Sequence, residues 1–191
     1  MAPARVALIA SLVVACAAAS RSIVSNAAQS LDSPASAWTV SNGTSTVAAR
    51  VPGDLITDLA TGGVIPADPL FELNFRADDW DASNWTYTTT FTLAADVAAA
   101  AQILLVFDGV KMVSDIALNG VSLGYTADQF LRYSFDVTAA AKRAGSNTLT
   151  VSFPTGADPR NVEQRWMSCS GGWDCAFSSP LYASVRRVLC P

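Results

Sequence analysis

The sequence predicts an all-β fold in which antiparallel strands form a sandwich. From Trp38 onward, short runs rich in Val, Ile, Thr, Phe and Tyr are separated by Gly, Pro, Asn and Asp, a pattern typical of such sandwiches. Apolar and polar residues alternate within several of these runs, as they do in half-buried strands. Asn119-Gly120 stands between two of them and is the strongest short hairpin pattern. Because helical periodicity is scarce, we expect less than about one-fifth of the chain to be helical.

The first predicted strands differ in how their apolar residues are distributed. Residues 86–93 place Tyr87, Phe91 and Leu93 on one face and threonines on the other, which predicts a half-buried antiparallel strand. Residues 103–107 are apolar on both faces and predict a central strand that is covered on both sides. One further strand is expected later in the chain, with Leu149, Val151 and Phe153 on its apolar side.

Between these strands we expect a hairpin, a further strand and one helical turn. Residues 112–125 are predicted to fold back at Asn119-Gly120, because both central residues of a type I′ turn need positive φ. Residues 130–137 alternate and predict a strand with one apolar face. Thr138 is expected to cap a short helical turn over residues 139–143, which Gly145 would end.

Two segments do not show the periodicity of helices or strands. Residues 50–84 are dense in Pro, Gly and Asp, and residues 154–180 contain the most distinctive motif of the chain. We expect both to be long loops, which in compact domains usually serve function or structural contacts. Within the first, Val51-Pro52-Gly53 and Asp68-Pro69 are interpreted as rigid loop geometry.

The amino terminus has the pattern of a secretory leader. Arg5 is followed by an uncharged, alanine-rich apolar run from residue 6 to residue 19, which predicts a signal peptide over residues 1–19. We expect cleavage near Ala19, with Ala27 as a second candidate, and an unstructured lead-in over residues 20–37. The run is too short to cross a membrane. The alternative is a helix buried in the core.

Composition excludes several classes of function. The chain contains no histidine and has a formal net charge of −4. Ser-His-Asp and Cys-His catalysis are therefore excluded, and the basic surface of a nucleic-acid binder is missing. Glu72 and Glu163 are the only glutamates, and no aspartate stands in a recognisable catalytic motif. We predict no metal, no cofactor, no nucleic-acid partner and no membrane partner.

Sequons and cysteines are consistent with the secretory route. Asn42-Gly43-Thr44 and Asn84-Trp85-Thr86 are possible glycosylation sites. Cys16 lies in the predicted leader, which leaves three cysteines in the mature chain. Cys169 and Cys175 could form a disulfide and leave Cys190 free; alternatively, all three are small buried residues.

An ordered set of motifs resembles the amino-terminal region of the β-mannosidases of glycoside hydrolase family 2. Short pieces such as Leu-Asn-Gly also occur in related β-galactosidases and β-glucuronidases, whereas the full set with Gly-Gly-Trp-Asp points to mannosidases. The set comprises residues 51–55, Leu59, 62–65, 68–69, Asn74, Trp80, 85–87, 107–110, 116–120, 123–124, Phe130, 133–138, 147–149 and 171–174.

This resemblance implies a jelly-roll sandwich of the galactose-binding-like type over residues 38–191. Complete enzymes of the family continue into immunoglobulin-like domains and a TIM barrel that holds the catalytic glutamates, the acid/base following an asparagine. No Asn-Glu dipeptide occurs in this chain. We therefore expect an inactive fragment whose parent enzyme removes terminal β-linked mannose from a β-mannoside or glycan in the secretory pathway, either secreted or in lysosomes or vacuoles.

Asp174, with Trp173 beside it, is the predicted substrate-binding site. The resemblance implies that this loop reaches the barrel's pocket, where the aspartate contacts mannose hydroxyls. The glycines allow close backbone approach, an indole offers a flat face to a sugar ring, and a carboxylate accepts hydrogen bonds from hydroxyls. The sequence departs from the family at Cys175-Ala176-Phe177, where Trp-Ala-Pro is usual. The alternative is that Trp173 is a core residue and Asp174 a turn residue.

For the other aromatic residues we expect core or interdomain packing, not sugar stacking; these residues are Trp80, Trp85, Tyr87 and Trp166.

Two alternative functions stay open, a free-standing carbohydrate-binding lectin and a structural remnant without function. A lectin would carry a concave polar and aromatic patch of its own, whereas an accessory domain would expose an apolar face.

Overall fold

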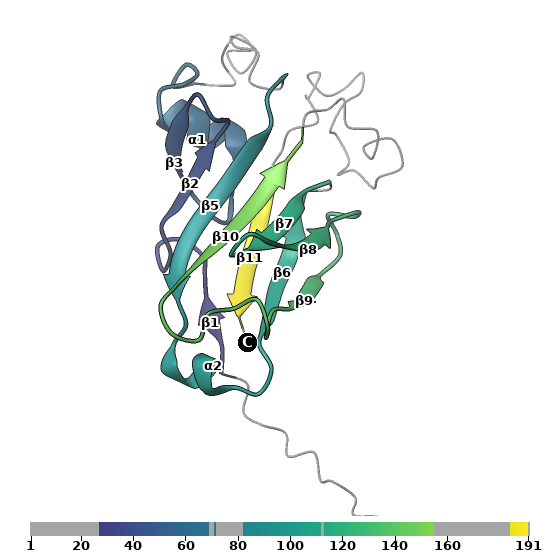
Figure 1. The fold of residues 1–191 in the computed structure, drawn as a ribbon. Helices are drawn as coiled ribbons and strands as arrows, with labels where there is room; N and C mark the ends of the chain where they lie inside the picture. Colours follow the sequence, from purple (N-terminus) through teal and green to yellow (C-terminus); the bar gives the residue numbers. More distant parts are fainter. Residues whose placement is uncertain (1–26, 69–70, 72–81, 112, 155–183, 191) are drawn as a thin grey trace, which may run out of the picture.

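The protein forms two antiparallel sheets packed face to face, as the sequence predicts (Figure 1). The computed structural model describes residues 27–68, 71, 82–111, 113–154 and 184–190, with backbone alone described for the last stretch. One sheet has the order β1-β11-β6-β9, with β4 also pairing with β11, and the other has the order β3-β2-β5-β10-β7-β8. The strands are β1 Gln29–Ser30, β2 Trp38–Ser41, β3 Thr46–Ala49, β4 Gly53–Asp54, β5 Trp85–Thr92, β6 Leu104–Val110, β7 Asp115–Leu118, β8 Val121–Tyr125, β9 Tyr133–Asp136, β10 Ser146–Phe153 and β11 Ser184–Cys190; the helices are α1 Leu55–Thr61 and α2 Ala95–Ala99.

The predicted strands and hairpin are confirmed. Strand β5 buries alternate residues and pairs along its whole length with β10, whose inward side chains include the three predicted from sequence. Strand β6 is central, between β11 and β9, but only one of its faces is fully buried, since Leu104 and Val106 are half-exposed. Asn119 and Gly120 both have positive φ, at 53° and 81°, and join β7 to β8.

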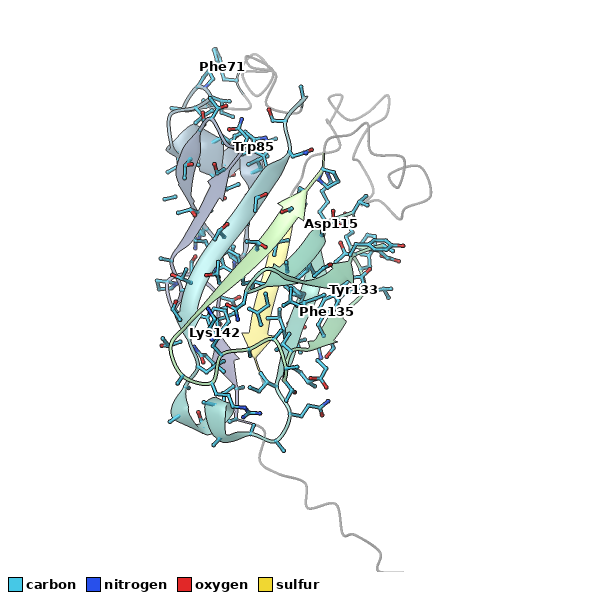
Figure 2. All side chains as sticks on the ribbon, in the orientation of Figure 1. Phe71, Trp85, Asp115, Tyr133, Phe135 and Lys142 are labelled. Atoms are coloured by element: carbon cyan, nitrogen blue, oxygen red, sulfur yellow. The ribbon has the colours of Figure 1, made fainter. Side chains whose placement is uncertain are left out.

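The region after the hairpin is less regular than the sequence predicts. Strand β9 is four residues long instead of the expected eight, because Phe130 and Leu131 lie in a turn with more than half of each side chain exposed. Tyr133 and Phe135, labelled in Figure 2, then stack with their ring planes at 10°. The predicted cap at Thr138 is wrong, because the Thr138 hydroxyl oxygen accepts a hydrogen bond from the Ile103 amide. A single turn does follow, in which the Val137 carbonyl oxygen accepts from the Ala140 and Ala141 amides, but it does not continue as a helix over residues 139–143.

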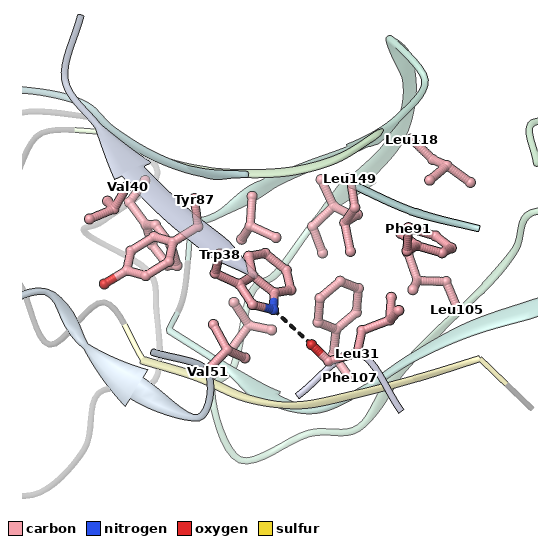
Figure 3. Close-up of a cluster of buried hydrophobic side chains, with 14 of the residues drawn as sticks. Leu31, Trp38, Val40, Val51, Tyr87, Phe91, Leu105, Phe107, Leu118 and Leu149 are labelled. Carbon is pink, nitrogen blue, oxygen red and sulfur yellow. Dashed lines mark hydrogen bonds between the residues drawn. The ribbon is translucent and has the colours of Figure 1, made fainter. Parts of the chain in front are cut away.

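The core lies between the two sheets and is built around large side chains (Figure 3). Trp85, Tyr87 and Phe107 are at most 1% exposed, which confirms the predicted packing role of Trp85 and Tyr87; Trp80 and Trp166 lie outside the described residues. Trp38 closes one side of the core, and its Nε1 donates to the Leu31 carbonyl oxygen at 2.7 Å. This bond satisfies a polar group that burial would otherwise leave unpaired.

Part of the predicted lead-in belongs to the fold. Residues 20–37 were expected to be unstructured, but Gln29 and Ser30 form β1 and pair with the end of β11. Leu31 is fully buried under Trp38. A two-residue strand is too short to show alternation in the sequence. It forms only because it pairs with a strand about 160 positions later in the chain. The predicted leader over residues 1–19 lies outside the described residues.

Helix α1 was missed within the predicted loop over residues 50–84. Asp54 caps it, because its carboxylate accepts hydrogen bonds from the Thr57 amide at 2.9 Å and the Thr57 hydroxyl at 2.8 Å. Leu55 and Leu59 occupy one face four residues apart and are fully buried. Aspartate as a cap followed by this spacing is a recognisable helix start, but seven residues are too few for clear periodicity. The short helix α2 was not predicted either.

Candidate functional site

The predicted substrate residues Trp173 and Asp174 lie outside the described residues, as do Cys169, Cys175, Glu72 and Glu163. The strands on either side of their segment are described. Strand β10 ends at Phe153, which pairs with Trp85, and β11 begins at Ser184, which pairs with Asp54. The end of β10 and the start of β11 lie at the same end of the sandwich (Figure 1). We call this the loop end.

A buried carboxylate stabilises the structure near the loop end. Asp58 in α1 is 4% exposed; its Oδ1 accepts a hydrogen bond from the Arg50 amide at 3.0 Å and its Oδ2 accepts one from the Tyr87 hydroxyl at 3.0 Å. Burial raises the pKa of Asp58 to about 6, although the two hydrogen bonds act in the opposite direction and the nearby Asp54 adds to the increase. Burial also raises the pKa of Tyr87. These contacts join α1 to β5 and to Arg50, the residue after β3. The role of Asp58 is therefore structural.

A second buried polar group follows β6 at the same end. Lys111 is 5% exposed, and burial lowers its pKa to about 7. Its carbonyl oxygen accepts a hydrogen bond from the Thr126 hydroxyl at 3.0 Å, and that hydroxyl lies 2.8 Å from the Ser114 hydroxyl. Val113 between them has φ of 48°, which is strained for a β-branched residue. These contacts hold the β6–β7 connection against the segment after β8.

Large apolar side chains are exposed along β8 and in the turn that follows it. Tyr125 ends β8 and pairs with Asp115, the first residue of β7. Phe130 and Leu131 follow in the turn before β9. We define the β8–β9 patch as the four large apolar side chains of this stretch that are 50–59% exposed, Val121, Tyr125, Phe130 and Leu131. We take these four side chains as a candidate contact surface.

The turn that carries Phe130 and Leu131 of the β8–β9 patch is held by several hydrogen bonds. The Tyr133 hydroxyl oxygen accepts hydrogen bonds from the amides of Ala127 at 2.8 Å and Asp128 at 2.6 Å, and its hydrogen is donated to the Asp128 carbonyl oxygen. Asp128 Oδ1 in turn accepts from the Phe130 amide at 2.8 Å. Arg132 forms an ion pair with Asp108 at 2.7 Å. The apolar side chains are thus presented on a turn that needs little ordering before it binds a partner.

The two sequons occupy different structural positions. Asn42 opens the turn between β2 and β3, whereas Asn84 is exposed immediately before β5. Among the described residues, no group of three His, Cys, Asp or Glu side chains lies close enough to hold a metal ion. Nor do these residues include a helix that is long and apolar enough to cross a membrane.

Sequence reasoning found the two sequons but none of the other groups described above. Of the β8–β9 patch, Leu131 was predicted on the apolar face of a strand and Phe130 on its opposite face, and Asp58 lay in a predicted loop. Asp58 could have been suspected from its position between Leu55 and Leu59, because a carboxylate inside a buried helical stripe needs a hydrogen-bonding partner.

The chain matches the family model described as the glycosyl hydrolase 2 galactose-binding domain-like domain over residues 38–182. Among curated proteins, the β-mannosidase of Rattus norvegicus is 39% identical over 112 residues, which cover 57% of this chain and 13% of that protein. The β-mannosidase of Bos taurus is 31% identical over 174 residues, which cover 77% of this chain and 20% of that protein. The chain thus spans 13–20% of the length of these relatives.

Solved structures agree on the fold. A β-D-mannosidase from Dictyoglomus thermophilum superposes with a TM-score of 0.72 at 25% identity, over 86% of this chain and 22% of that chain. The exo-chitosanase CsxA of Amycolatopsis orientalis has a TM-score of 0.65 at 18% identity, over 86% and 20% of the two chains. At that identity the second match supports the fold alone.

Proposed function

Because the chain belongs to the glycosyl hydrolase 2 galactose-binding domain-like family, as the N-terminal domain of β-mannosidase-like proteins, we propose that it is the non-catalytic accessory domain of a β-mannosidase. The whole enzyme would remove terminal non-reducing β-D-mannose. Retaining glycosidases need a pair of carboxyl groups flanking the scissile bond, and the resemblance puts that pair in a barrel domain. The predicted leader and the sequons support a place in the secretory pathway, secreted or lysosomal or vacuolar.

The observation that carries this proposal is the β8–β9 patch. An isolated sugar-binding domain has no need for apolar side chains exposed by half or more on a rigid turn, whereas a domain that docks onto a larger body does. The matched relatives are five or more times as long as the aligned part. We therefore take the occupant of the β8–β9 patch to be the catalytic part of the same enzyme.

The free-standing lectin is not favoured. The curated relatives contain this domain within much longer proteins named β-mannosidases. Trp38, Trp85 and Tyr87 are buried in the core, and the exposed aromatic residues Tyr125 and Phe130 belong to the β8–β9 patch, which we assign to docking.

We also propose that Trp173 and Asp174 contribute to the substrate pocket of the parent enzyme. Support comes from the described residues on either side of their segment, the end of β10 and the start of β11, which lie at the loop end near Tyr125 of the β8–β9 patch. If the β8–β9 patch docks onto the catalytic part, that body lies next to the loop end. The disulfide between Cys169 and Cys175 stays a prediction.

Asp174→Ala is expected to separate stability from activity. The test uses a chimera in which this chain replaces the matching segment of the bovine β-mannosidase. Loss of a charged hydrogen bond to a hydroxyl should lower kcat/KM for an aryl β-mannoside at least about tenfold, while the melting temperature of the isolated chain stays the same. The isolated chain itself should show no turnover. Unfolding of the Asp174→Ala chain would instead make Asp174 a structural turn residue.

Phe130→Ser tests the β8–β9 patch against a matched control. Phe71 is equally exposed, at 59%, but belongs to a different part of the chain, so Phe71→Ser serves as the control. Both substitutions should leave the isolated chain equally stable, because neither side chain is buried in it. In the chimera, Phe130→Ser should lower activity at least about tenfold through lost apolar contact, and Phe71→Ser should not. Equal behaviour of the two chimeras would exclude the β8–β9 patch as the docking surface.

A further inference from the structure

The turn between β2 and β3 is organised by the side chain of Asn42. Its Oδ1 accepts hydrogen bonds from the amides of Thr44 at 3.0 Å and Ser45 at 2.8 Å. The Asn42 amide donates to the Ser45 carbonyl oxygen at 3.2 Å, and Gly43 has φ of 88°. The carbonyl oxygen of the side chain is therefore fully used by the turn. Among the described residues, the nitrogen Nδ2 has no hydrogen-bond partner.

The surroundings of this turn leave room for a large substituent. A Cβ added at Gly43 would meet no atom within 4 Å, and Gly43 and Thr44 are both exposed. Strand β3 is one edge of its sheet and β8 is the other. Five strand spacings separate the two edges, which amounts to about 24 Å. A glycan on the β2–β3 turn would thus leave the β8–β9 patch open.

The second sequon is placed differently. Its middle residue, Trp85, is 1% exposed and belongs to the core. Thr86 lies in β5, where it pairs with Ser41 on one side and Ser152 on the other. Its hydroxyl lies 3.0 Å from the Ser152 hydroxyl. The sequon of Asn84, itself exposed, therefore runs directly into a paired core strand, whereas that of Asn42 is confined to a turn in which Asn42 is partly buried and Gly43 and Thr44 are exposed.

We propose that Asn42 is a site of N-linked glycosylation, with a lipid-linked oligosaccharide as the donor. The Asn42 Nδ2 attacks the anomeric carbon of the first sugar, and the bond from that carbon to the polyprenyl diphosphate oxygen breaks. The diphosphate leaves with the electron pair of that bond, and Nδ2 loses one of its two hydrogens as a proton. The product is an N-glycosidic bond on a nitrogen that makes no contact the fold needs. This inference depends on entry into the secretory route and not on the proposed enzyme.

The test compares the full chain with four variants expressed in a eukaryotic secretory host. Asn42→Gln and Thr44→Ala destroy the first sequon, Thr44→Ser preserves it, and Asn84→Gln destroys the second. Wild type, Thr44→Ser and Asn84→Gln should lose mass on treatment with a peptide N-glycosidase, which converts the modified asparagine to aspartate, and peptide mass spectrometry should locate that aspartate at position 42. Asn42→Gln and Thr44→Ala should show no glycan at this turn.

A second set of the same proteins carries a proven secretory leader before Met1. These proteins enter the route whether or not residues 1–19 function as a leader. An unmodified Asn42 in the protein secreted from this set overturns the proposal, and so does a glycan found at Asn84 alone. A glycan at Asn42 that appears only with the added leader supports the site and shows that the predicted leader is wrong.

Discussion

Asn119→Ala is expected to lower the free energy of unfolding by about 3 to 4 kcal/mol. The Asn119 Nδ2 donates to the Ala140 carbonyl oxygen and to Asn147 Oδ1, each at 2.8 Å, and its Oδ1 accepts from the Thr148 amide at 3.0 Å. Each such bond contributes about 1 kcal/mol net. Alanine at φ of 53° adds roughly 1 kcal/mol of backbone strain, which asparagine tolerates better.

Two control variants separate the backbone contribution from the side-chain contribution. Asn119→Gly loses the same three hydrogen bonds but keeps the positive φ, so it should be about 1 kcal/mol less destabilising than alanine. Gly120→Ala meets no atom within 4 Å and adds strain only, at φ of 81°, which should cost about 1 kcal/mol. Urea unfolding, monitored by tryptophan fluorescence, measures the free energy of unfolding of all three variants. If Asn119→Ala costs no more than Gly120→Ala, the side-chain contacts do not stabilise the hairpin.

Asp58→Asn is expected to abolish a loss of about 3 kcal/mol in the free energy of unfolding that the wild type undergoes between about pH 4 and pH 7. Burial raises the pKa of Asp58 from 3.8 in the unfolded chain to about 6 in the folded protein. The folded state therefore favours the neutral carboxyl, so this group's contribution to stability is complete below about pH 4 and is lost as the pH rises through 6. One pKa unit corresponds to about 1.4 kcal/mol. Asparagine stays neutral throughout and should remove this loss.

Hydrogen bonding allows this substitution without an unpaired group. The asparagine carbonyl can accept from the Arg50 amide, and its NH₂ can donate to the Tyr87 hydroxyl oxygen. Wild type and Asp58→Asn should be similarly stable near pH 4, and the variant should be more stable at pH 7. Tyr87→Phe removes a hydrogen bond that lowers the Asp58 pKa, so its loss of stability should still begin near pH 4 but should continue to a higher pH and become larger than in the wild type. A stability difference between wild type and Asp58→Asn that is constant from pH 4 to pH 7 would contradict this assignment.

The site could be predicted only in part. The motif around Asp174 is recognisable because its residue types and order are distinctive, and the sequons are short local patterns. The exposure of Leu131 in the β8–β9 patch was missed since alternation over residues 130–137 places it on the apolar face, and exposure depends on where the strand begins to pair. Strand β9 pairs with β6 only from Tyr133 onward, so Phe130 and Leu131 stay outside the sheet.

The sequence by itself determined the local features of this protein. The alternation in β5 and β10 and the Asn119-Gly120 turn depend on neighbours a few residues apart, so their chemistry can be recognised along the chain. Tertiary structure decided the features that join distant segments. Strand β1 exists because Gln29 pairs with Cys190, and the Asp58 pKa is raised because folding buries this carboxyl group. Strand pairing and desolvation depend on residues that come into contact only in the folded protein, and no local sequence pattern specifies those contacts.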